Sequence, residues 1–245
     1  MHNPFYTIRP IACIRSDLRE RFGIPRQAGL APDLTARIVF EEAFRKKEAV
    51  KGMEAFSHLW LIWGFSETGI DMTEDQVQWS PLVTPPRLGG KIRAGVFATR
   101  SPYRPNSLGL SCVRLLDIDL SCEDAPVLTV GGADLLDGTP IYDIKPYVPY
   151  ADCHPDASGG FAVSEAKSLQ VVFPQPLLDK IPPEKRSALL QILQQDPRGS
   201  YEKQPGYVYG LHFSDYDIRF TVEDKVLTVF DILPHTGSGS FTRVK

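Results

Sequence analysis

The sequence predicts a mainly β protein, with a small β-barrel over residues 1–165 followed by a small α+β domain over residues 166–245. Three observations point to this class. Most apolar segments are short and rich in β-branched or aromatic residues, which is typical of strands. Gly and Pro together account for 40 of the 245 residues, which favours frequent turns over long helices. The clearest helical pattern lies after residue 165.

The first domain is expected to consist of short strands joined by Gly- and Pro-containing turns, an arrangement that favours a barrel or another closed sheet. Residues 57–65, SHLWLIWGF, are almost continuously apolar, as in a strand buried on both faces. The sequence DGTP at 137–140 predicts a turn before a final strand. The other expected strands are 6–14, 36–40, 95–99, 110–120 and 127–131.

The second domain begins after residues 152–164, which have the composition of a loop or linker. A strand is expected at 168–173. Residues 182–195 predict a helix because prolines open it and three leucines form an apolar stripe. Three strands are expected after it, with a tight hairpin at 223–225 joining the last two; they span 207–213, 217–222 and 226–233.

Several classes of protein are excluded by composition. The longest apolar run, at 60–65, is far too short to span a bilayer, and the first residues lack a signal-peptide core. The four cysteines form no CxxC pair, which is typical of free thiols in a reducing compartment. The five histidines show neither HxH nor HxxxH spacing, so a zinc site built from them is not expected. These features predict a cytoplasmic protein without a metal.

Charge is distributed unevenly along the chain. The net charge is −3, yet residues 76–116 contain six Lys and Arg residues and neither Asp nor Glu. Five of the six are Arg, whose planar guanidinium suits phosphate and carboxylate groups. This segment fits recognition of an anionic partner. A solvated basic loop whose carboxylate partners lie elsewhere in the fold is the alternative.

Common nucleotide-binding signatures are missing. The chain has no GxGxxG, no GxxxxGK[ST] and no GxSxG, so a Rossmann enzyme is not expected. Residues 95–111, GVFATRSPYRPNSLGLS, instead place Arg100 and Arg104 on a loop stiffened by two prolines, which suits anion binding. Asn106 adds an amide suited to a base edge, and Tyr103 can stack on a base. A rigid connector with arginines bracing the barrel is the other interpretation.

A second polar pair follows the DGTP turn. Asp143 and Lys145 alternate on the predicted strand and therefore share one face. A carboxylate and an amine facing one cleft suit acid–base or substrate-orienting roles. A local ion pair on the surface is the alternative. The segment 24–30, IPRQAGL, taken alone, is an ordinary loop.

Together these segments resemble the TsaA-like (TrmO) family of tRNA methyltransferases. The resemblance rests on GIPRQAGL, GMEAFSHLWLIWGF, PPRLGGKIRAGVFATRSPYRPNSLGLS and DLLDGTPIYDIKPYVPYAD, with a looser match to QQDPRGSY and YVYGLHFSDYDIRFTV in the second domain. It implies a β-barrel that binds S-adenosylmethionine without a Rossmann sheet. It also implies a homodimer that methylates N6 of N6-threonylcarbamoyladenosine, beside the anticodon of a threonine tRNA.

The resemblance further implies which residues act. Cofactor contacts fall on Pro25, Arg26, Gln27, Ser66, Glu67, Arg100, Leu110, Asp137, Gly138, Thr139 and Pro140. Arg104, Asn106 and Lys145 match positions assigned to RNA or to the modified base. For catalysis, Asp143 is the candidate general base, and Arg100, Arg104 or Lys145 can stabilise an anion at N6.

Two departures from the family pattern stand out. Ser107 replaces a proline that the family's RPNPIG motif more often carries, which is expected to loosen the loop slightly. Ser66 and Glu67 stand where relatives carry His-Gln. Two other functions stay open at this point: a non-catalytic RNA-binding barrel, and a barrel methyltransferase with a small-molecule or different RNA acceptor.

Overall fold

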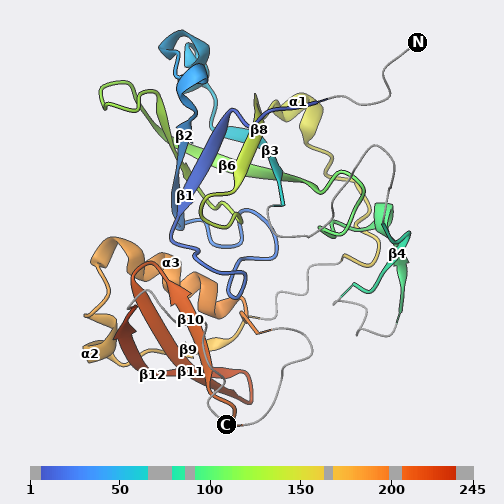
Figure 1. Cartoon of the computed structure of the whole chain (residues 1–245). Coiled ribbons are helices and arrows are strands. Elements are labelled where there is room, and N and C mark those ends of the chain that lie inside the picture. The colour runs from blue at the N-terminus through green and yellow to red at the C-terminus, as the bar shows by residue number, and fades with distance from the viewer. Residues whose placement is uncertain (1–6, 66–78, 86–91, 163–167, 199–205, 236–245) are drawn as a thin grey trace. The chain divides into compact units, whose positions relative to one another are not determined.

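A computed structural model describes residues 7–65, 79–85, 92–162, 168–198 and 206–235 of the chain (Figure 1). The chain forms two compact units, each discontinuous in sequence. The first unit comprises Met1–Arg15, Arg37–Thr129 and Gly138–Val163, and the second comprises Ser16–Ala36, Val130–Asp137 and Ser164–Lys245. The domain boundary expected between residues 165 and 166 stays a prediction.

In the described part of the chain, six strands close into a barrel, in the order β1-β2-β7-β6-β3-β8 (Figure 1). This confirms the predicted mainly β, barrel-containing fold. Strand β3 pairs antiparallel with both β6 and β8. The barrel strands are β1 Ala12–Ser16, β2 Thr35–Phe40, β3 His58–Gly64, β6 Leu108–Asp119, β7 Val127–Gly131 and β8 Pro140–Pro146.

Strand β3 fills the barrel with alternate side chains. Leu59, Leu61 and Trp63 are buried inside, whereas Trp60 and Ile62 are only half-buried. The expectation that this strand is buried on both faces is therefore wrong. In a closed barrel one face of each strand points outward, and β3 carries large apolar residues on that outer face as well.

The segment expected to be a strand at 95–99 is mostly not one. Strands β4 Leu82–Val83 and β5 Ala94–Gly95 form a short hairpin, after which Val96–Ala98 turn into a 3-10 helix. The Val96 N–H donates to the Pro81 carbonyl. The Thr99 N–H and the Thr99 hydroxyl both donate to the Val96 carbonyl. These bonds close a turn that an extended strand could not make. Three further 3-10 helices follow β2, at Glu42–Phe44, Lys47–Val50 and Met53–Ala55.

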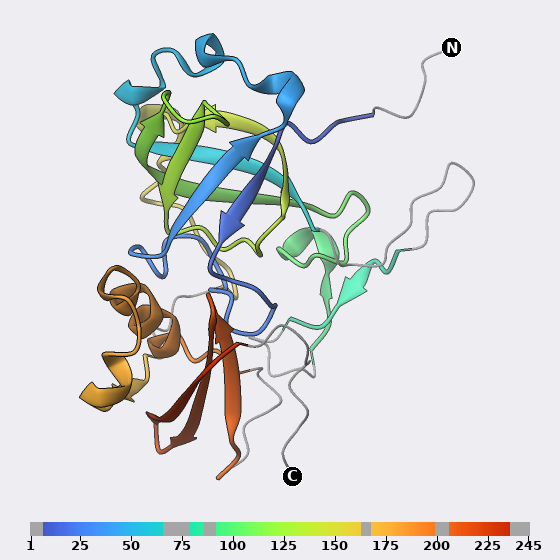
Figure 2. The same ribbon diagram turned by 60° about the vertical axis from the view of Figure 1, so that its left-hand side comes forward.

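The second unit contains a four-stranded mixed sheet, in the order β10-β11-β12-β9, with helices on one face (Figure 2). Helix α3 buries Ala188, Leu189, Ile192 and Leu193, so the predicted apolar stripe is confirmed. The helices are α1 Pro149–Asp152 in the first unit and α2 Gln175–Leu178 and α3 Pro183–Gln194 in the second, and the sheet strands are β9 Gln170–Val172, β10 Tyr209–Phe213, β11 Tyr216–Glu223 and β12 Val226–Pro234.

The N-terminal segment of the second unit packs into the same core. Leu18, Ala31 and Leu34 are buried in one cluster with Phe213, and Leu18 forms an isolated bridge with Phe213. Among the described residues, no helix combines the length and apolar character needed to cross a membrane.

Candidate functional site

The loop that the sequence singled out, residues 99–107, is held in place by its own hydrogen bonds. The Arg104 guanidinium donates to the Thr99 carbonyl at 3.1 Å. The Ser101 N–H donates to the Thr99 hydroxyl, and the Tyr103 N–H donates to the Ser101 hydroxyl. The loop is therefore preorganised, and Arg104 takes part in that organisation.

Ser107 closes this loop in a left-handed conformation, with φ at 41°. Its N–H and its hydroxyl both donate to the Arg104 carbonyl, at 3.0 and 3.3 Å, and the Phe65 N–H donates to the Ser107 carbonyl at 2.9 Å. Proline is fixed near φ −65° and lacks an N–H, so it cannot occupy this position in this conformation. The expectation that Ser107 merely loosens the loop is wrong, because the serine is part of the turn that joins the loop to β6.

Side chains of this loop differ in exposure. Arg100 and Asn106 are exposed, and the Tyr103 side chain is 51% exposed. The loop thus presents a cation, an amide and an aromatic ring to solvent from a fixed backbone. Such a set can hold a carboxylate or phosphate and a base ring together.

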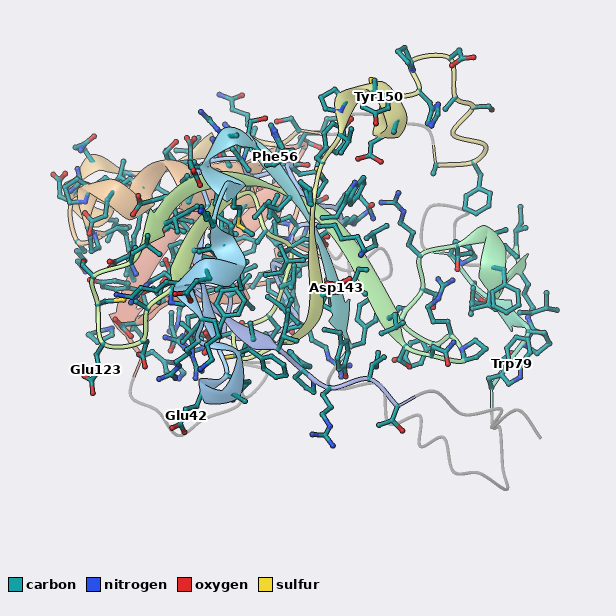
Figure 3. All side chains as sticks on the ribbon, turned by 90° about the horizontal axis from the view of Figure 1, so that it is seen from above. Glu42, Phe56, Trp79, Glu123, Asp143 and Tyr150 are labelled. Atoms are coloured by element: carbon teal, nitrogen blue, oxygen red, sulfur yellow. The ribbon has the colours of Figure 1, made fainter. Side chains whose placement is uncertain are left out.

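Three of the predicted residues lie on one outer face of the barrel. Leu110 on β6 and Asp143 on β8 both pair with Ile62 on β3, and Lys145 pairs with Trp60. Partners in register point to the same side of a sheet, so Leu110, Asp143 and Lys145 share this face. Leu110 on this face is 55% exposed. The position of Asp143 on β8 can be followed in Figure 3.

Asp143 and Lys145 form an ion pair on that face. The Lys145 Nζ lies 3.0 Å from Asp143 Oδ2, with the lysine side chain 63% exposed and the aspartate side chain 47% exposed. The second carboxylate oxygen accepts the N–H of Ile144 at 2.9 Å. The prediction that the two side chains share a face is confirmed, and their contact orients the carboxylate.

Aromatic side chains extend this outer face. Trp60 packs against Tyr147, with ring centroids 5.8 Å apart, and its Nε1 donates to Asp152 Oδ2 at 3.0 Å. The Val148 N–H donates to the same oxygen at 2.7 Å. These bonds, chiefly that from Val148, lower the pKa of Asp152. The result is a fixed connection between β3 and α1, next to Tyr150, which is 92% exposed (Figure 3).

The DGTP turn is built as predicted. Gly138 has φ at 77°, a conformation that suits glycine. Its N–H donates to the Ile14 carbonyl, and the Ile14 N–H donates to the Thr139 carbonyl at 3.1 Å. Thr139 is buried, and Pro140 is half-buried and opens β8. The turn is therefore anchored to β1.

Asp137, the first residue of that turn, has both carboxylate oxygens engaged. Oδ1 accepts the Ser16 N–H at 2.9 Å, and Oδ2 pairs with the Arg19 guanidinium. Arg19 is a residue that sequence reasoning missed, because it carries no motif and lies 118 positions away in the chain. These contacts make Asp137 a residue that fixes the segment leading to IPRQAGL.

In that segment, Pro25 is buried, Arg26 is exposed and Gln27 is half-buried. The Gln27 amide donates to the carbonyl of Arg26. Ser66 and Glu67 lie outside the described residues. The described site residues predicted from the sequence thus belong to both units. Those of the 99–107 loop, the outer barrel face and positions 138–140 lie in the first unit, and those at 25–27 and 137 lie in the second.

Comparisons with known proteins support one family. Residues 13–153 match the model of the tRNA-methyltransferase O N-terminal domain, and residues 166–235 match that of the TrmO C-terminal domain. The chain is 38% identical to a tRNA (adenine(37)-N6)-methyltransferase of Escherichia coli, over 94% of this chain and 98% of that protein. A protein of the same name from Eikenella corrodens is 43% identical over 69% of this chain and 92% of its own. The crystal structure of TrmO from Pseudomonas aeruginosa matches with a TM-score of 0.75 and 32% identity, covering 94% of this chain and 98% of that one.

Proposed function

Because the chain belongs to the TrmO family of tRNA methyltransferases, we propose that it transfers a methyl group from S-adenosylmethionine to N6 of adenosine 37 in tRNA. The observation that carries this proposal is the similarity to the Escherichia coli enzyme along nearly the whole length of both chains. The barrel agrees with it, since the chain has no Rossmann motif and its charged, preorganised loop supplies a different means of binding an anionic group.

Residue types at the predicted cofactor positions fit S-adenosylmethionine. Its methionyl carboxylate needs a cation, which exposed Arg100 offers. Its apolar parts need an apolar surface, which half-exposed Leu110 offers. When bound, the cofactor supplies an electrophilic methyl group on a sulfonium sulfur. Gly138 and Thr139 hold the DGTP turn in a fixed shape, which lowers the entropy lost on binding.

For the acceptor, we propose N6-threonylcarbamoyladenosine in a threonine tRNA. This modified base carries a carboxylate, for which the 99–107 loop offers the fixed guanidinium of Arg104. Exposed Tyr103 offers a ring on which a base can stack. Asn106 can donate to and accept from a base edge.

The acceptor nitrogen is a weak nucleophile because its lone pair is delocalised into the ring and the carbamoyl group. The chain's part is to orient it and to take or neutralise its proton. We propose Asp143 as the proton acceptor, with Lys145, 3.0 Å away, orienting its carboxylate. We propose that Arg104 and Lys145 stabilise negative charge that develops on the base.

We also propose that the protein is a cytoplasmic homodimer. Four cysteines are free, as in reducing compartments. Phe97 is 70% exposed and packs against Trp79, which is 37% exposed, with ring centroids 5.6 Å apart, and neighbouring apolar rings on a surface fit an interface with another chain. Light scattering during gel filtration tests this: a mass of one chain, about 27.3 kDa, would contradict the dimer.

Mass spectrometry of nucleosides tests the function. The protein and S-adenosylmethionine are incubated with tRNA that carries, or lacks, the threonylcarbamoyl group. One added methyl on the modified adenosine alone supports the full proposal. Methylation of both tRNAs contradicts the choice of acceptor only. No methylation, with cofactor binding intact, indicates a different acceptor. No methylation and no cofactor binding supports a non-catalytic RNA-binding barrel.

A matched pair of variants tests the cofactor residue. Arg100→Ala is expected to abolish binding of S-adenosylmethionine in calorimetry, since it removes the cation for the carboxylate. Arg93→Ala removes another exposed arginine of the same basic segment and is expected to leave the affinity unchanged. Equal affinities in both variants would refute the assignment of Arg100.

A further inference from the structure

Three titratable side chains of the second unit gather at one end of its sheet, none of them among the residues assigned above. His212 on β10 pairs in register with Asp217 on β11, so both side chains lie on one face. His235 follows β12, and its backbone N–H donates to the Asp215 carbonyl at 2.8 Å. Atoms able to ligate a metal, one from each of His212, Asp217 and His235, all lie within 4.8 Å of one another.

Hydrogen bonds fix which ring nitrogens carry protons. His212 Nε2 lies 2.9 Å from the Ser214 carbonyl oxygen. A carbonyl only accepts, so Nε2 carries the proton and Nδ1 of the neutral ring keeps its lone pair. His235 Nδ1 lies 3.0 and 3.2 Å from the two Asp217 oxygens, so it carries a proton that it donates to the carboxylate.

The spacing of the His235–Asp217 contact matches that of two metal ligands. Ligands that lie about 2.0–2.1 Å from a tetrahedral zinc ion are about 3.3 Å apart. The nitrogen–oxygen distance of 3.0 Å is therefore close to what an ion between them would impose. The ring of His212 is stacked on that of His235, with centroids 3.6 Å apart and an angle of 20° between the planes. The two imidazoles therefore lie side by side, and one ligating atom of each lies within 4.8 Å of the other and of an Asp217 oxygen.

We propose that His212, Asp217 and His235 form a binding site for a divalent transition-metal cation such as Zn²⁺. Two imidazoles and one carboxylate suit zinc, nickel or copper better than calcium or magnesium, which prefer oxygen. Three protein ligands leave a fourth position for water. The Ser214 carbonyl, by accepting from Nε2, holds the ring of His212 in the ligating tautomer.

The exchange at this site balances in protons. The cation takes the place of the proton on His235 Nδ1. When the ring is the imidazolium, binding releases that proton, and when the ring is neutral, the proton moves to Nε2 and none is released. The affinity is therefore expected to fall as the pH is lowered, because protons compete with the metal for the imidazoles. Side chains at the site are accessible to an ion, since His235 is 25% and Asp217 18% exposed.

Calorimetric titration of the metal-stripped full chain with Zn²⁺ tests the proposal. We expect one ion per chain, with affinity at least tenfold lower in His235→Gln and in Asp217→Asn, which preserve shape. His154→Gln, which alters an exposed histidine of the first unit, is expected to bind as the wild type does. Unchanged affinity in both site variants, or no binding at millimolar Zn²⁺, would overturn the proposal.

Two readouts cover the case in which a variant fails to fold. In wild-type protein, the imidazole resonances of His212 and His235 are expected to shift on adding Zn²⁺ while that of His154 stays in place; the reverse pattern would contradict the site. Thermal melting gives the second readout. Zinc at about 100 times its dissociation constant raises the folded-to-unfolded ratio about 100-fold, and an unchanged melting temperature would also contradict it. Neither readout depends on methyl transfer, so failure here is distinct from failure of the proposed function.

Discussion

Gly109, the glycine that follows the 99–107 loop within β6, lies against a buried tryptophan. It pairs in register with Trp63, and a Cβ added at Gly109 would lie 2.3, 2.4 and 2.6 Å from three carbons of that ring. Carbon atoms in contact prefer about 3.5–4.0 Å, so the ring would have to move by about 1 Å or more.

Trp63 has little freedom to make that movement. Its side chain is inside the barrel, its Nε1 donates to the buried Ser111 hydroxyl at 3.0 Å, and its ring packs on Phe65 with centroids 4.3 Å apart. Forcing extra volume into such a site costs about 1–3 kcal/mol. We therefore expect Gly109→Ala to lower the free energy of unfolding by this amount.

Gly95→Ala is the matched control, because nothing lies within 4 Å of its added Cβ and its φ of −59° suits alanine. We expect Gly95→Ala to stay within about 0.5 kcal/mol of the wild type. Urea unfolding followed by tryptophan fluorescence measures both. Adding Trp63→Leu to Gly109→Ala is expected to cost less than the two single changes together. Equal urea midpoints for Gly109→Ala and Gly95→Ala would show that the added methyl group does not clash with Trp63.

Three further predictions concern separate parts of the chain. Ser107→Pro is expected to destabilise the protein by about 1–3 kcal/mol, since proline cannot adopt φ 41°, whereas Ser107→Gly stays near wild type in thermal melting. Asp196→Ala is expected to cost about 3 kcal/mol in urea unfolding because it leaves Arg198, 9% exposed, without its carboxylate. Asp231→Ala, which breaks the 3.9 Å pair with Arg219 whose side chains are 35% and 36% exposed, is expected to cost less than about 1 kcal/mol. Equal losses would contradict that contrast. Hydrogen bonds, first that from the Ser121 hydroxyl, lower the pKa of Asp119 to about 2. Because this pKa is lower in the folded state than in the unfolded state, the carboxylate stabilises the fold at pH values above its unfolded-state pKa, and the contribution is lost as the pH falls toward 2. NMR titration of the carboxyl group should show the pKa of Asp119 rising in Ser121→Ala. An unchanged pKa in that variant would contradict the role of the Ser121 hydroxyl.

Local features of the fold were predictable from the sequence because local chemistry determines them. The hairpin at 223–225 is confirmed, with φ at 44° for Asp224 and 68° for Lys225, as a two-residue turn between strands requires. Helix α3 is confirmed for a similar reason, since prolines and an apolar stripe mark it. The shared face of Asp143 and Lys145 follows from the two-residue repeat of a strand.

Long-range features were not predictable in the same way. Nothing in the local pattern shows that Leu18 and Leu34 are buried with Phe213, which is more than 170 residues away from either. The local sequence pattern does not indicate the Arg19–Asp137 ion pair either. Such contacts depend on how distant segments meet, which composition and periodicity do not encode.

The histidine cluster illustrates the same limit. Spacing rules such as HxxxH detect ligands on one helix or strand, and these rules argued against a metal site. His212 and Asp217 meet through the register of a hairpin, and His235, the residue after β12, joins them. The apolar outer face of β3 was misjudged because a barrel strand and a doubly covered strand can share one pattern.

Methyl transfer to adenosine 37 is tested most directly by locating the methyl group on the tRNA. After incubation with the protein and S-adenosylmethionine, the tRNA is cleaved into oligonucleotides and each fragment is sequenced by mass spectrometry. We expect one added methyl, on the base of adenosine 37, and no methyl anywhere when that adenosine is replaced by guanosine. A methyl at another position, or methylation that persists after the replacement, would contradict it.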